Sequence, residues 1–291
     1  MQRECNCSVI NMSDNETEAE DEFDVDPEVY AERIRAWLRS FPGLFGTPSD
    51  LFEAVLLGDV ERTRRLLREE PRCDPNDSWG AHGPVIFYAC GAGCPGKSDG
   101  DYAGCVAELI RAGANVNVVN PKTGKTPLHY IHYLHSDAPA IAKLLVDAGA
   151  NVNARTFDEP GRYTLLSIQT GRPVVVSPRR GNTVLWDLPP NYPPRMLKAS
   201  RRAAPILLRA GAPLDAPING WPGNRRPPEI TPPPGTFHDP YLQRVHDTGG
   251  FKAYEKQHLL AVTAMYEPKF PQLPKEVVRH LMTFCFHVGY Y

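Results

Sequence analysis

The histidines between residues 129 and 135 are the first candidates for metal chemistry in this sequence. His129 and His132 lie one helical turn apart, and His135 follows three residues later. Side chains three residues apart share one face of a helix, whereas a separation of six residues turns them well away from each other. His135 cannot join His129 at one ion, and we predict that these histidines bind no metal.

A second candidate metal site combines one histidine with three cysteines. His82, Cys90, Cys94 and Cys105 are of the residue types that bind zinc. Their spacing matches none of the usual zinc patterns, and Cys90 falls on the inward face of an apolar stretch. We predict a chain without a bound metal ion or other cofactor.

The sequence contains no constellation of residues that indicates catalysis. It has no Gly-Xaa-Ser-Xaa-Gly turn for a nucleophilic serine, no glycine-rich phosphate loop before a helix and no His-Glu-Xaa-Xaa-His motif. Paired carboxylates are confined to the acidic N-terminal stretch and to solvated faces such as Glu69-Glu70. We therefore predict that the protein is not an enzyme.

The charge of the chain is strongly asymmetric. Up to Glu28 there are ten acidic residues and one basic residue, a balance of −9, which leaves +7 on the remaining 263 residues. A stretch with this composition cannot bury enough apolar surface to fold, so we expect residues 1–25 to form a disordered acidic tail. Arginine pairs beginning at positions 64, 179, 201 and 225 leave nucleic-acid binding as a minor alternative function.

The cysteines and the N-terminus indicate a cellular compartment. Met1 to Ile10 lacks the apolar core of a secretory signal, no run of eighteen apolar residues occurs, and the seven cysteines are odd in number. We expect a protein with reduced thiols that is cytoplasmic, with a nuclear location as an alternative, and neither secreted nor bound to a membrane.

Internal repeats organise the middle of the chain. The segment Arg-Ala-Gly-Ala-Asn-Val-Asn at 111–117 returns as Asp-Ala-Gly-Ala-Asn-Val-Asn at 147–153, and in weaker form as Arg-Ala-Gly-Ala-Pro-Leu-Asp at 209–215. Each copy follows a short apolar stretch with helical spacing. The first two copies are 36 residues apart, a period typical of stacked helical repeats.

These segments resemble those of ankyrin-repeat proteins. The Thr-Pro-Leu-His signature of that family is intact at residues 126–129 and follows Gly124. The resemblance implies that the proline starts a helix, that Thr126 and His129 exchange hydrogen bonds and that Leu128 packs inward. The alanine of the family pattern is replaced by Ile131, which implies looser spacing from the neighbouring repeat.

The resemblance extends to four units. They cover residues 49–76, 83–117, 123–153 and 181–215, of which the third is the most regular. We therefore predict an all-α fold, an ankyrin-repeat solenoid of about four irregular repeats, within residues 47–216. Residues 26–46 are predicted to form an N-terminal capping helix that begins at Pro27.

An additional stretch separates the third and fourth units. Residues 163–168 and 173–177 are strand-like and are joined through Thr170-Gly171, which predicts a β-hairpin inserted at 157–180. The alternative is a decayed repeat that starts at Thr164. A proline-rich connection follows the fourth unit at 217–240.

The remaining residues, 241–291, are predicted to form a C-terminal helical extension. Leu273, Val277, Leu281 and Phe284 share one face of its last helix. The Leu-Pro-Xaa-Glu-Val-Val sequence at 273–278 weakly resembles the opening of an F-box, and the domain order resembles ankyrin proteins that end in a SOCS box. This helix would either cap the repeats or recruit a ubiquitin ligase.

The resemblance implies a function in protein recognition. Ankyrin proteins bind partners through the concave face of the stack, so we expect a scaffold or adaptor without chemistry, whose partner protein the sequence does not identify. Aromatic and cationic side chains often anchor such interfaces. The candidates on the predicted concave face and finger loops are Trp79, His82, Tyr88, Lys122, Lys125, Tyr133 and His135.

Overall fold

The described part of the chain is helical. In this computed structural model the described residues are 27–39, 49–69, 72–78, 83–91, 100–121, 123–131, 137–156, 185, 194–214 and 237–287. Within these ranges there is no β-strand, and Ser78 and Pro84 form an isolated antiparallel bridge. The predicted hairpin at 157–180 lies outside the described residues.

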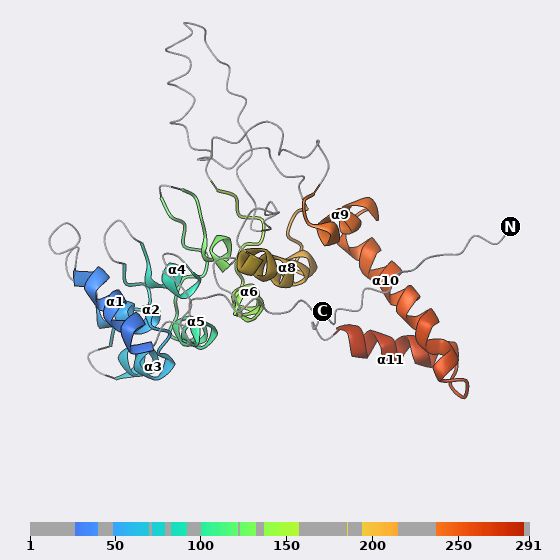
Figure 1. Cartoon of the computed structure of the whole chain (residues 1–291), viewed down its shortest axis with the longest axis horizontal. Coiled ribbons are helices and arrows are strands. Elements are labelled where there is room, and N and C mark those ends of the chain that lie inside the picture. Colours follow the sequence, from blue (N-terminus) through green and yellow to red (C-terminus); the bar gives the residue numbers. More distant parts are fainter. Residues whose placement is uncertain are drawn as a thin grey trace, which may run out of the picture.

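The helices follow one another in the order shown in Figure 1. They are α1 (Pro27–Arg39), α2 (Asp50–Leu56), α3 (Val60–Arg68), α4 (Val85–Ala89), α5 (Tyr102–Arg111), the 3-10 helix η2 (Pro127–His129), α6 (Ala138–Asp147), α8 (Pro194–Arg209), α9 (Pro240–Asp247), α10 (Phe251–Tyr266), the 3-10 helix η5 (Glu267–Lys269) and α11 (Lys275–His287).

Aspartate side chains start three of these helices. The carboxylate of Asp59 accepts a hydrogen bond from the backbone N–H of Arg62, and Asp101 accepts one from Gly104. Asp239 accepts from the first turn of α9, whose first residue is Pro240. Such caps satisfy backbone donors that have no partner inside the helix, which explains why the helices begin at these residues.

Neighbouring helices share one core. α2 packs on α3 and α4, α3 on α5, α5 on α6, and α6 on α8, and Figure 1 shows α3, α5 and α6 in one row. The core runs without interruption from Ile34 in α1 to Ala212 after α8 and includes Phe52 and Phe87. No single pair could bury these side chains, so the pairs are stable only when stacked.

Asparagines at the ends of the first and second units fix the position of each on the next unit. The side chain of Asn76 donates to the carbonyl of Gly113 and accepts from the N–H of Asn115. One unit later, Asn117 makes the same two bonds to Gly149 and Asn151, at 3.0 and 2.7 Å. In the weaker third copy of the segment, Pro213 occupies the position of Asn115 and Asn151, and proline has no N–H to donate.

The N-terminal helix covers the first end of the stack. Ile34 of α1 is fully buried in the core, and Arg35 binds Glu53 of α2 at 3.0 Å. Val29 of the same helix is exposed. It lies in the first turn of α1, five residues before Ile34.

The C-terminal extension has two small cores of its own. Leu242 and Val245 of α9 pack on Ala204 and Leu208 of α8, with Phe237 beside them. Farther along, α10 and α11 form a pair, and no other described element makes more than marginal contact with α11. Figure 1 shows this pair set apart from the repeat helices.

Helix α11 is apolar on two adjacent stripes. Val278 and Met282 are buried against α10, whereas Val277 and Leu281, which belong to the stripe noted in the sequence, are exposed at 42% and 40%. Spacing alone does not say which stripe meets α10.

Two glycines allow the first and second units to touch. Gly58 has a φ of +66°, and its carbonyl accepts a hydrogen bond from the N–H of Asp101 at 3.1 Å. A Cβ on Gly58 would lie 2.4 Å from the Cα of Gly100, and a Cβ on Gly100 would lie 2.5 Å from the carbonyl oxygen of Leu57. Only two glycines fit this backbone crossing.

We expect Gly58→Ala to lower the free energy of unfolding by about 2 kcal/mol, because it combines a positive φ with a backbone clash. Chemical denaturation of the full chain measures this change. Gly113 also has a positive φ but nothing within 4 Å of its Cβ position, so it is the matched control. An equal loss in Gly113→Ala would show that backbone conformation, and not the contact, carries the effect.

Candidate functional site

His129 has a structural position inside the third unit. Its side chain is fully buried, and its Nδ1 accepts a hydrogen bond from the backbone N–H of Thr126 at 3.1 Å. The Thr126 hydroxyl lies 2.9 Å from the same nitrogen. The lone pair of Nδ1 is therefore used within the signature, which agrees with the role that the family resemblance implies and opposes metal binding there.

Tyr88 does not project from the concave face as predicted. It is 4% exposed, and its ring meets that of Phe52 edge-on at 5.4 Å. Burial raises the pKa of its phenol. The sequence prediction was wrong because an aromatic residue in α4 is drawn into the gap between α2 and α4, where it removes more apolar surface from water.

Lys125 lies at the edge of the core. Its ammonium is 5.3 Å from the centre of the Tyr130 ring, and burial lowers its pKa. Tyr130 in turn packs on Phe87 of α4 at 5.2 Å. Lys125 thus makes an intramolecular cation–π contact with Tyr130. This contact holds the loop before η2 against the second unit.

The other five candidate residues cannot be placed. Trp79, His82, Lys122, Tyr133 and His135 lie outside the described residues. The loop from Asn120 to Lys125 that contains Lys122 is closed by a hydrogen bond from the N–H of Asn120 to the carbonyl of Lys125 at 2.8 Å.

The two described cysteines of the candidate zinc set are core residues. Cys90 and Cys105 are fully buried, and burial raises the pKa of the Cys105 thiol to about 12. Thr63 contacts the Cys105 Sγ at 3.6 Å. Cys94 and His82 are outside the described ranges, and among the residues within them no three His, Cys, Asp or Glu side chains gather into a metal site.

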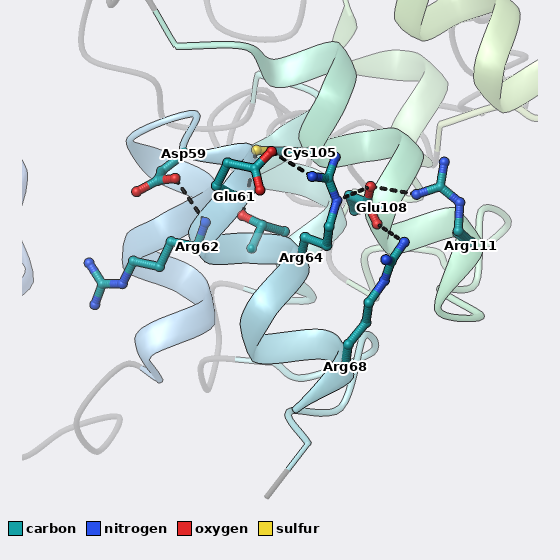
Figure 2. Close-up of polar contacts among 9 residues, drawn as sticks. Asp59, Glu61, Arg62, Arg64, Arg68, Cys105, Glu108 and Arg111 are labelled. Atoms are coloured by element: carbon teal, nitrogen blue, oxygen red, sulfur yellow. Dashed lines mark hydrogen bonds and ion pairs between the residues drawn. The ribbon is translucent and has the colours of Figure 1, made fainter. Parts of the chain in front are cut away.

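The most concentrated polar arrangement lies on the outer helices α3 and α5 (Figure 2). Glu108 of α5 receives Arg64 Nε at 2.8 Å and Arg68 Nη2 at 3.2 Å, both from α3, and Arg111 Nη1 at 2.5 Å from its own helix. Glu61 binds the other side of Arg64. Residues 40 and 44 positions apart in the sequence are thereby joined across two units.

Glu108 is the buried centre of this cluster. It is 5% exposed, whereas the side chains of Arg64, Arg68 and Arg111 are 36% to 58% exposed. Burial alone would raise its pKa, but the hydrogen bonds and charges of Arg111 and Arg64 outweigh burial and hold the pKa below its ordinary value of 4.5. The carboxylate stays ionised at neutral pH because the arginines surround it.

Three guanidinium groups share this one carboxylate. Each guanidinium has five N–H groups, and Glu108 has only two oxygens, so the carboxylate cannot use all of these donors, and the three arginine side chains are 36% to 58% exposed. We call the surface formed by Arg64, Arg68 and Arg111 the cationic face. The arginine pair at 64 is visible in the sequence, but the cluster is not, because its centre comes from α5. The i, i+4 spacing of Arg64 and Arg68, which places both side chains on one face of α3, was the feature of the sequence that could have indicated the cluster.

Comparison with known families identifies one part of the chain. The ankyrin repeat family model matches residues 123–157, which covers the third unit. No curated protein matches the chain. Separately, none of the helices in the described ranges has the length and apolar character needed to cross a membrane.

We expect Glu108→Gln to lower the free energy of unfolding by about 1 to 2 kcal/mol at pH 7, because three half-exposed arginines lose their shared counter-charge. The pKa of Glu108 is lowered by folding, so its contribution is complete above pH 4.5 and is lost as the pH falls below that value. Denaturation of both proteins between pH 7 and about pH 3 measures this. A difference that does not shrink at low pH would contradict the assignment.

Proposed function

We propose that this chain, which contains an ankyrin repeat at residues 123–157, is a non-catalytic protein-binding module built as a solenoid of about four repeats. Ankyrin repeats are typically interaction modules, which supports a protein as the partner. The observation that carries the proposal is the repeated asparagine contact from Asn76 to Asn115 and from Asn117 to Asn151, because it gives three successive units the same stacking.

The partner would bind on the concave side, along the finger loops. One of these loops, at 120–125, is closed by its own backbone bond, and Lys125 anchors it to Tyr130. A rigid support with replaceable tip residues is suited to recognition. The proposed contact residues on this side remain Trp79, His82, Lys122, Tyr133 and His135.

We expect Lys122→Glu to weaken partner binding at least roughly tenfold, since a charge reversal at an interface introduces repulsion. The full chain is used to isolate a partner from cells, and the affinity of that partner is then measured by calorimetry. Lys143→Glu is the matched control, because Lys143 is exposed on the outer helix α6 and pairs only with Asp147 in the described residues. Equal weakening by both substitutions would contradict binding at the finger loops.

A second candidate function is that of a substrate adaptor of a ubiquitin ligase, through the C-terminal helix. The specific observation in its favour is the position of α11, which packs on α10 and has only marginal contact with other described elements. Val277 and Leu281, one turn apart, form an exposed apolar stripe. A helix that capped the repeats would bury such a stripe against them.

We expect the double substitution Val277→Glu and Leu281→Glu to remove a cullin-linked partner from the purified full chain while changing its stability by less than about 0.5 kcal/mol, since both side chains are exposed. Leu260→Glu with Met265→Glu is the control, because it changes two exposed apolar residues of α10 in the same way. The adaptor function is wrong if no ligase subunit co-purifies with the unaltered chain.

A further inference from the structure

The cationic face carries more positive charge than its own carboxylates neutralise. Arg64, Arg68 and Arg111 share Glu108, and Glu61 contributes a second negative charge at the side of Arg64. Glu108 is enclosed, so the negative charge lies inside and the guanidinium groups lie outside. Such a surface attracts an acidic group from solvent, and its guanidinium N–H groups are spaced to bind carboxylates in pairs.

Some other exposed cations in the described residues pair one to one with a carboxylate. Lys143 pairs with Asp147, and Arg209 pairs with Glu255. These pairs leave no excess charge at their own positions. The cationic face differs from them, because three arginines converge there on one buried carboxylate.

The chain itself contains the complementary charge. Eight of the thirteen residues 14–26 are Asp or Glu, and none is basic. We propose that this acidic segment binds across the cationic face, with its carboxylates accepting hydrogen bonds from the solvent-facing N–H groups of Arg64, Arg68 and Arg111. The acidic segment has an excess of negative charge and the cationic face an excess of positive charge, so their association reduces the net charge of each.

The acidic segment is attached next to the first unit. It ends immediately before Pro27, the first residue of α1. Helix α1 belongs to the same end of the stack as α3, because Arg35 of α1 binds Glu53 of α2, and Glu53 also binds Arg62 of α3 at 3.2 Å. Thirteen residues span up to about 45 Å when extended, whereas the nine residues of α3 span about 14 Å.

Covalent attachment favours this occupant over an external one. A linked segment is present at an effective concentration on the order of millimolar, far above that of most cellular partners. The contact would be electrostatic and solvent-exposed, so salt should release it, since the screening length falls to about 3 Å at 1 M salt. While bound, the segment would exclude other anions, including nucleic acid, from the face.

The test measures how fast individual arginines react with phenylglyoxal in the full chain, by peptide mass spectrometry. The comparison is with a variant carrying Glu16→Gln, Glu18→Gln, Glu20→Gln and Glu22→Gln. At low salt we expect Arg64, Arg68 and Arg111 to react roughly threefold or more faster in the variant, and this difference to vanish in 1 M salt. Arg279 on α11 is the internal control and should react equally in both proteins.

A reciprocal measurement uses cleavage of the acidic segment by a glutamate-specific protease. Arg64→Gln with Arg68→Gln should expose the segment and speed its cleavage. The matched control is Lys198→Gln with Arg202→Gln, which removes two exposed cations from α8 and should leave the cleavage rate unchanged.

Three results would overturn the proposal. Equal reaction rates of the three arginines in the unaltered and neutralised chains would mean that the segment does not bind there. A rise at Arg279 of the same size would mean a general charge effect without a defined site. Protection of the arginines by added DNA or polyglutamate, with no effect of the tail substitutions, would assign the face to an external partner.

Discussion

The stability of this protein depends on the contact between consecutive helix pairs. The apolar side of α2 and α3 has nothing to meet within its own unit, and it is buried only when α4 and α5 lie against it. The repeated asparagine bonds then fix the register, because each joins the end of one unit to a carbonyl and an N–H of the next. Burial supplies the energy, and these polar contacts supply the alignment.

The cluster at Glu108 follows from the same stacking. Arg64 and Arg68 reach a carboxylate of the next unit because α3 and α5 lie side by side in the outer row. A buried glutamate costs free energy unless it is surrounded by partners, so this site cannot form before the two units have docked. The cationic face on the outer helices is thus a consequence of the packing between the first and second units.

The sequence predicted those features that depend on neighbouring residues. The buried hydrogen bond between Thr126 and His129 was implied by a four-residue signature, and the start of α1 at Pro27 was predicted from the proline. Predictions failed where the burial or pairing of a side chain depends on an element that is distant in the sequence. Tyr88 is buried because Phe52 lies opposite, and the spacing along α11 did not indicate that α10 would cover Val278 and leave Val277 exposed. Glu108 went unnoticed because two of its three arginine partners come from another unit.

Pro213 removes the N–H that an asparagine of the preceding unit would accept from at the boundary between the third and fourth units. The fourth unit nevertheless packs on the third, because α8 lies against α6 and Ala203, Leu207 and Ala212 belong to the common core. Apolar burial therefore holds this boundary without the N–H contact that aligns the second and third units.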